Sequence, residues 1–158
     1  MLNKMIAINE IEFNTLEREI YEIGCEYARR LMAEVLMQVD EIISKERDKK
    51  IYRHKGKRRT TIKTLMGEVE IDRVIYKAKG ENGKTQHIYL LDKIINLNTY
   101  GQISSNLALK IAENASISSY RNTAKNITEL TGQSISHGGV WNIIQILGKK
   151  IKELYTYF

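Results

Sequence analysis

The 158-residue sequence contains no proline, a single cysteine and no long apolar run. Average usage of about 5% would place about eight prolines in a chain of this length. The lone Cys25 excludes an internal disulfide framework and any zinc site built from several cysteines. No segment approaches the roughly 18 apolar residues that span a bilayer, which excludes an integral membrane protein.

The sequence also lacks a secretory signal, a metal-ligand pattern and a catalytic group. The first residues, MLNKMIAINEIEF, form too short an apolar stretch for a secretory signal, so we expect a cytoplasmic protein. His54, His87 and His137 are scattered without metal-ligand spacing, and neither a nucleophile paired with a base nor a glycine-rich phosphate loop is evident. We therefore expect no catalytic residue, no metal, no cofactor and no enzymatic activity in this chain.

The net charge of +6 is unevenly distributed. Residues 1–44 hold four basic and nine acidic side chains, whereas residues 45–63 hold ten basic and two acidic ones. Such a block attracts polyanions through the release of counterions, although it could also be a solvated linker between a helix and a hairpin. We predict DNA-phosphate contacts from eight cations of this block: Lys49, Lys50, Arg53, Lys55, Lys57, Arg58, Arg59 and Lys63.

Residues 9–47 are predicted to form one long amphipathic helix. Apolar residues recur at steps of three and four, at Phe13, Leu16, Ile20, Ile23, Tyr27, Leu31, Val35, Val39 and Ile42. At 1.5 Å per residue the helix would reach roughly 55 Å, longer than a small domain is wide. Its apolar stripe must pack against something. Packing on the core of the same chain is the favoured interpretation, and packing on a second copy of the helix is the alternative. A bend at Gly24 is possible.

Residues 60–92 alternate with period two and predict a three-stranded antiparallel meander. We place one turn at residues 65–68, centred on Met66 and Gly67. Asn82-Gly83 predicts a second, tight turn because both residues accept positive φ angles. With these two as the loop, Tyr76 would face Tyr89 and Ile75 would face Leu90.

Three carboxylates alternate along the second strand of this meander, at Glu68, Glu70 and Asp72. Side chains at alternate positions share one face of a strand and could gather a divalent cation. The turn at Met66 and Gly67 would place Lys63 opposite Glu70, so ordinary cross-strand charge pairing is the favoured interpretation.

From residue 104 the pattern becomes helical again. Ser104 is a predicted N-cap, Ser118 or Ser119 begins a second helix that stops at Gly132, and Ser136 begins a third. The apolar stripe of the third helix runs to Phe158 without a stop signal. The chain is therefore expected to be a fragment of a longer protein.

The last two helices form a candidate helix-turn-helix, in which the second helix would enter the major groove. We predict base contacts from Ser136, His137 and Asn142 and phosphate contacts from Arg121 and Lys125. A plain helical hairpin looks similar in sequence, and the turn is about two residues longer than the tightest version. Trp141 is expected in the core.

Several segments resemble the ISLre group of bacterial insertion-sequence transposases, long filed as an uncharacterised protein family. They are RDKKIYRHKGKRRTTIKTLMGEVEIDRVIYK, the following YLLD, and SSYRNTAKNITELTGQSISHGGVWNIIQ. The resemblance implies an N-terminal DNA-recognition region that precedes a metal-dependent catalytic domain in full-length members. Members with cysteine pairs around the hairpin form a zinc ribbon there; this sequence lacks those cysteines, so no zinc is expected.

We therefore expect an α+β chain in three parts. Residues 1–48 form the long helix, residues 49–98 a basic loop and the β-meander, and residues 99–158 a helical region with the helix-turn-helix. The expected function is recognition of insertion-sequence ends in double-stranded DNA by a truncated or remnant transposase. It would act as a homodimer or paired with an intact transposase. The alternative is a structural protein that dimerises through its long helices without binding nucleic acid.

Overall fold

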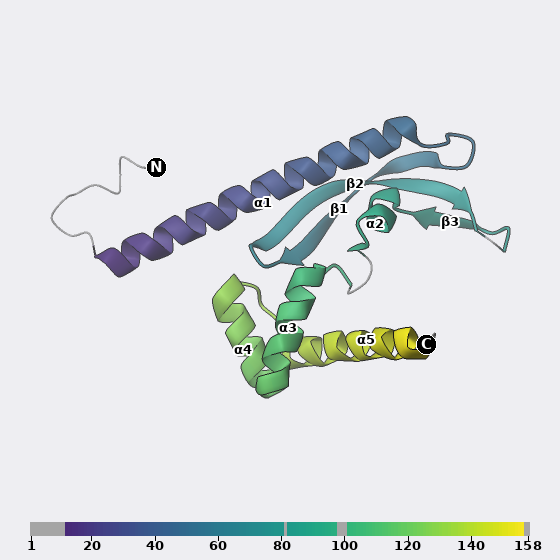
Figure 1. The fold of residues 1–158 in the computed structure, drawn as a ribbon. Helices are drawn as coiled ribbons and strands as arrows, with labels where there is room; N and C mark the ends of the chain where they lie inside the picture. Colours follow the sequence, from purple (N-terminus) through teal and green to yellow (C-terminus); the bar gives the residue numbers. More distant parts are fainter. Residues whose placement is uncertain (1–11, 81, 98–100, 157–158) are drawn as a thin grey trace.

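The structure is a computed structural model that describes residues 12–80, 82–97 and 101–156. Its order is helix, sheet, helices, which confirms the α+β prediction (Figure 1). The elements are α1 (Phe13–Glu46), β1 (Arg53–Thr64), β2 (Gly67–Lys79), β3 (Thr85–Ile88), α2 (Leu90–Ile94), α3 (Ser105–Ile117), α4 (Tyr120–Thr131) and α5 (His137–Thr156). Residues 9–11 of the predicted first helix, and Phe158, lie outside the described residues.

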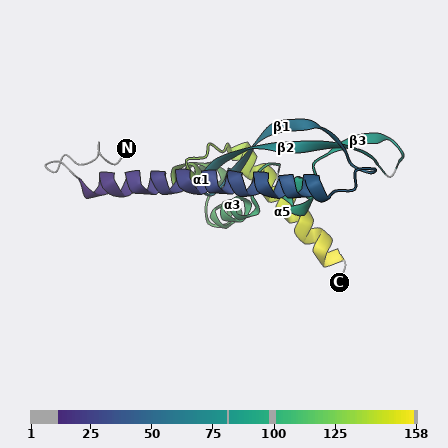
Figure 2. The same cartoon turned by 90° about the horizontal axis from the view of Figure 1, so that it is seen from above.

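The apolar contacts between α1 and the sheet come from the C-terminal half of the helix. Ala33, Leu36, Val39 and Ile43 contact a core formed by the sheet and the segment after it, which comprises Ile62, Val69, Ile71, Leu91 and Leu97. The N-terminal half extends past the end of the sheet, and the helix continues through Gly24 without interruption (Figures 1 and 2). Core packing therefore accounts for part of the predicted stripe, whereas Phe13 and Tyr27 are at least 70% exposed.

The sheet is an antiparallel meander in the order β1-β2-β3, as predicted. However, β1 begins at Arg53, so the expectation of a basic loop before residue 60 is wrong. The charged side chains of this part of β1 are exposed, and such charged residues are typical of an edge strand. A bulge lies between His54 and Gly56, where the register with β2 shifts.

The first turn closes one residue earlier than predicted. Thr64 pairs with Gly67, so Lys63 lies opposite Glu68 and the predicted Lys63–Glu70 pair is wrong. The Thr64 hydroxyl explains the shift, since Oγ1 accepts from Met66 N at 3.2 Å and donates to Gly67 O at 2.8 Å.

The second turn is wider than a two-residue hairpin. Gly80 N donates to Lys84 O at 2.8 Å and Gly83 N donates to Gly80 O at 2.9 Å, which closes a loop of five residues. Tyr76 consequently pairs with Ile88, and the predicted pairs with Tyr89 and Leu90 are wrong.

The predicted third strand also ends too late, because residues 90–92 belong to α2. Leu91 and Asp92 are both buried, although they are neighbours in sequence. In a strand their side chains would point to opposite faces. The helical turn lets Leu91 enter the core while Asp92 reaches Arg73 of β2.

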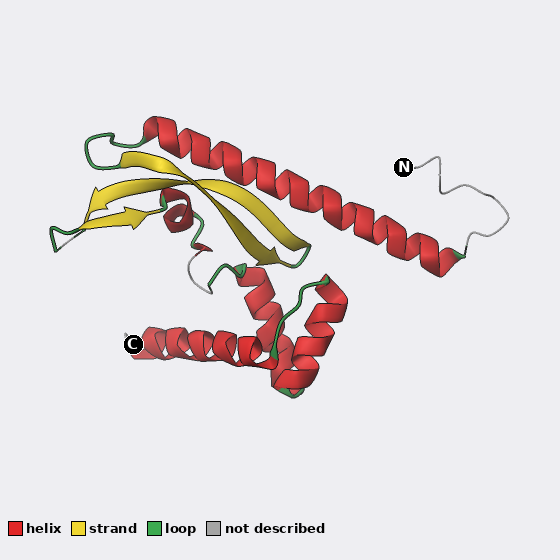
Figure 3. Ribbon diagram, turned by 180° about the vertical axis from the view of Figure 1, so that it is seen from behind, coloured by secondary structure: helices red, strands yellow, loops and turns green. Residues whose placement is uncertain are grey.

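Helices α3, α4 and α5 form a three-helix bundle beside the first turn of the sheet (Figure 3). Its core comprises Leu107, Ala108, Ile111, Ala124, Ile127, Val140 and Ile143. The predicted boundaries are confirmed: Ser104 Oγ accepts from Leu107 N at 3.2 Å, and Gly132 ends α4 in the left-handed region at φ 65°. Ser119 caps α4, and Ser136 Oγ accepts from Gly139 N at 3.0 Å.

Candidate nucleic-acid interface

The basic block forms the exposed edge of the sheet. Arg53, Lys55, Lys57, Arg58 and Arg59 are all exposed on β1. Because successive side chains in a strand point to opposite faces, Arg58 lies on the other face from Lys57 and Arg59. The edge thus carries cations on both faces, and a polyanion lying along it can contact both rows. Lys49 and Lys50, in the turn before β1, are also exposed.

The ion pairs that Arg59 makes are long and exposed. Its Nη1 lies 3.8 Å from Glu70 Oε2 and its Nε lies 3.9 Å from Asp72 Oδ1. The Arg59 side chain is 73% exposed, so solvent screens both pairs and the guanidinium stays accessible. The three alternating carboxylates lie opposite Lys63, Thr61 and Arg59, which supports the charge-pairing interpretation. Among the described residues, no three potential ligand side chains are placed to hold a metal ion.

A second group of cations lies where β1 begins. Arg53 is directly opposite Lys77 of β2, and like charges in that position destabilise a sheet. Lys50, Arg53, Lys77 and Lys79 line one open hollow of about 480 Å³ without an acidic side chain among its lining residues. Sequence reasoning missed Lys77 and Lys79, because their proximity to the block appears only when β1 is extended back to Arg53.

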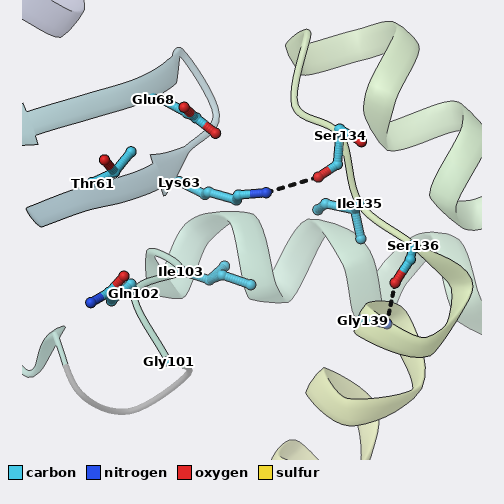
Figure 4. Close-up of a pocket in the computed structure, with 10 residues that line it drawn as sticks. All are labelled: Thr61, Lys63, Glu68, Gly101, Gln102, Ile103, Ser134, Ile135, Ser136 and Gly139. Carbon is cyan, nitrogen blue, oxygen red and sulfur yellow. Dashed lines mark hydrogen bonds between the residues drawn. The ribbon is translucent and has the colours of Figure 1, made fainter.

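Lys63 joins the sheet to the helical bundle. Its Nζ donates to Ser134 O at 2.8 Å, across a cleft lined by both parts (Figure 4). Its backbone N donates to Gln102 O at 2.9 Å, and its backbone O accepts from Ser104 N at 2.9 Å. Lys63 therefore has a structural role in addition to the phosphate contact predicted for it, which stays a prediction.

Helices α4 and α5 present the remaining predicted residues. Arg121 and Lys125 are exposed on α4, where Lys125 Nζ lies 3.8 Å from Glu129 Oε1. Ser136, His137 and Asn142 are exposed at the start of α5. The Ser136 hydroxyl caps α5, as predicted, and the base contact also predicted for it stays a prediction.

Trp141 does not lie in the core, contrary to expectation. Its side chain is 51% exposed, whereas Val140 and Ile143 are buried. The predicted stripe of α5 is filled by Val140, Ile144 and Leu147, and Trp141 lies outside it. Periodicity was the signal that could have shown this, since Trp141 follows Val140 by only one residue.

A buried charge cluster ties the sheet to α1 and α2, which pack together in one core. Arg73 forms an ion pair with Asp92, donates from Nε to Thr60 Oγ1 at 2.8 Å, and stacks on Tyr89 with its guanidinium carbon 3.9 Å from the ring centre. Asp40 of α1 accepts from Val74 N at 2.6 Å. Burial raises the pKa of Asp40, an effect that the Val74 hydrogen bond opposes.

The fold and its surfaces define an α+β chain with a long N-terminal helix, a basic edge strand and a C-terminal three-helix bundle. No helix in the part of the chain that the structure describes is both long and apolar enough to cross a membrane. Residues 6–154 match the family described as "Uncharacterised protein family (UPF0236)", and the chain belongs to that family.

Similar proteins occur in Caldanaerobacter subterraneus subsp. tengcongensis. UPF0236 protein TTE2489 is 28% identical over 152 residues, which is 94% of this chain and 30% of the relative. UPF0236 protein TTE0402 is also 28% identical over 94% of this chain. A third relative, 26% identical over 89% of this chain, has a name that joins eleven locus designations. The chain spans about 30% of the length of the curated relatives it matches.

Proposed function

We propose that this chain is the DNA-binding portion of an insertion-sequence transposase of the ISLre type and recognises the ends of its element. The observation that carries the proposal is the basic edge strand: five cations of β1 are exposed, and the same molecule carries exposed polar side chains on the outer side of α5. Exposed cations supply affinity for the phosphates of a duplex without reading its sequence.

The comparisons support a mobile element. One protein name shared by eleven loci of one organism is the pattern that repeated copying of a DNA segment leaves. The relatives are about three times longer than the matched region, which leaves room for a separate catalytic domain in them. We further propose that the portion covered by this chain binds DNA and does not cut it alone.

In this proposal the two basic surfaces contact the DNA backbone and α5 contacts the bases. Phosphates contact the cations of β1 and its neighbours Lys77 and Lys79, while Arg121 and Lys125 hold the backbone beside the bundle. The exposed side chains of α5 contact the bases. The link between Lys63 and Ser134 keeps the sheet and the bundle in one register on the duplex.

Fluorescence anisotropy of a labelled element-end duplex, titrated with the full chain at several salt concentrations, tests the proposal. The Arg58→Ala/Arg59→Ala variant should weaken binding on every sequence and reduce the log–log salt slope by about 1.8, since each lost phosphate contact removes about 0.9. The matched control is Lys45→Ala/Lys110→Ala, which removes two cations already paired with Glu41 and Glu113. Absence of binding at low salt would refute the proposal.

The exposed half of α1 favours a second candidate function, a dimerisation module. Phe13, Leu16, Ile20, Ile23 and Tyr27 follow a 3-4-3-4 spacing typical of a coiled-coil seam. Four of them are at least 50% exposed, namely Phe13, Ile20, Ile23 and Tyr27. This candidate needs no contact with DNA.

The charges beside this seam select a parallel arrangement of two copies. In a parallel pair, Glu19 would face Gly24 and Glu26 would face Leu31 of the other copy. In an antiparallel pair, the glutamates of one helix would face those of the other and repel them.

Sedimentation equilibrium of the full chain tests dimerisation. Ile20→Ser/Ile23→Ser should shift the mass from dimer toward monomer, whereas Ile117→Ser, which changes an 84% exposed residue of α3, should not. A wild-type chain that stays monomeric at high concentration would contradict this candidate, independently of any DNA binding.

A further inference from the structure

One row of exposed side chains follows the outer side of α5. His137, Trp141, Gln145 and Lys149 recur every four residues and are all exposed, and Asn142 lies beside them. Residues at this spacing lie on the same side of a helix. At 1.5 Å per residue the row is about 18 Å long, enough to follow the major groove over several base pairs. The opposite side of α5 is occupied by the bundle core.

The chemistry of this row is uneven. Residues 137–148 contain neither Arg nor Lys, the side chains that most often read guanine through its O6 and N7 atoms. They do contain Asn142 and Gln145, whose amides match the N6 and N7 atoms of adenine. Trp141 offers a 51% exposed indole, an apolar surface suited to the thymine methyl group. The first basic residue, Lys149, comes at the far end, where a phosphate contact suits it.

We propose that the outer row of α5 reads A·T base pairs in the major groove, with Gln145 and Asn142 on adenine and Trp141 against a thymine methyl. This inference rests on the proposed function and adds the class of sequence that the chain selects. It assigns base contacts to Trp141 and Gln145, which sequence reasoning had left out. It also moves the reading surface from the tip of α5 to the side of its first three turns.

The sequence provides a direct probe, because Trp141 is its single tryptophan. The full chain is titrated with two duplexes of equal length, one of mixed A·T pairs and one of mixed G·C pairs, while intrinsic fluorescence and electrophoretic mobility are followed. We expect the A·T duplex to bind more tightly and to quench Trp141. Acrylamide should then quench the bound protein less than the free protein.

Three variants and one control test the roles of Gln145 and Trp141. Gln145→Ala should reduce the preference for A·T over G·C by about 5- to 150-fold, the range for one bidentate base contact. The matched control, Gln38→Ala, changes an exposed glutamine of α1 and should leave the preference unchanged. Trp141→Phe keeps an apolar ring and should retain most of the preference, whereas Trp141→Ala should not. Thermal melts by circular dichroism check that each variant is folded.

The outcomes separate this inference from the proposed function. Binding to duplexes with unchanged Trp141 fluorescence, or with a preference for G·C pairs, would overturn the A·T inference and leave DNA binding intact. If Gln145→Ala keeps the preference for A·T over G·C duplexes, the base contact assigned to Gln145 is wrong. No binding to either duplex at low salt would overturn the proposed function itself.

Discussion

Removing the carboxylate of Asp92 should be the most damaging single change to this fold. The side chains of Arg73 and Asp92 are 7% and 1% exposed, so the pair is shielded from solvent. Asp92→Ala would leave a buried guanidinium that keeps its hydrogen bond to Thr60, its contact with the Tyr89 ring and a weaker electrostatic interaction with Asp40. The expected loss is about 3–5 kcal/mol, which is a large part of the roughly 5–15 kcal/mol that stabilises a domain.

Urea unfolding followed by circular dichroism measures this loss. The double variant Arg73→Met/Asp92→Leu replaces the pair by apolar side chains of similar size and should recover most of the stability. Lys110→Ala breaks an exposed pair with Glu113 and should leave the unfolding midpoint almost unchanged. If Asp92→Ala costs less than about 1 kcal/mol, as for a surface pair, the buried cluster does not hold α2 on the sheet.

Three further changes test separate features. Because the folded state binds the proton of Asp40 more tightly than the unfolded state does, the wild type should lose stability as pH rises from the ordinary aspartate pKa through the raised pKa of Asp40. Asp40→Asn should not show this loss. The difference between the two curves of unfolding free energy against pH measures it. Gly67→Ala should destabilise by about 1–3 kcal/mol in thermal melts, because φ is 116° and a Cβ would lie 2.6 Å from Arg29 Nη1. Ser104→Ala should cost about 1 kcal/mol in urea unfolding by removing the cap on Leu107 N.

Local signals in the sequence predicted the helical bundle well. Ser104, Ser119 and Gly132 act within one helical turn of themselves, so a hydroxyl or a glycine is enough to mark a helix end. The same holds for the inner stripe of α5, in which Val140 and Leu147 pack on the core. These boundaries depend on neighbours in sequence and need no knowledge of the rest of the chain.

Features that depend on distant segments were predicted poorly. The basic segment was predicted as a loop because its charged residues show no apolar alternation. Such a charged strand is tolerated at the edge of a sheet, where β1 lies. The Arg73–Asp92 pair joins residues 19 apart in sequence. It depends on the short helix α2, which hydrophobic periodicity did not predict. In the candidate site, the exposed cations were named from sequence, whereas Lys77 needed the strand register to be placed beside Arg53.

That register gives a test that separates two roles of the charged edge. Cations on an edge strand also prevent two sheets from pairing, so the exposed cations of β1 have two candidate roles. Lys77→Glu would replace the repulsion from Arg53 by attraction and should stabilise the sheet by about 0.2–1 kcal/mol. If this surface contacts phosphate, the same change should weaken duplex binding. A variant that is more stable and binds DNA as the wild type does would assign these cations to protection of the edge and exclude the hollow they line from the interface.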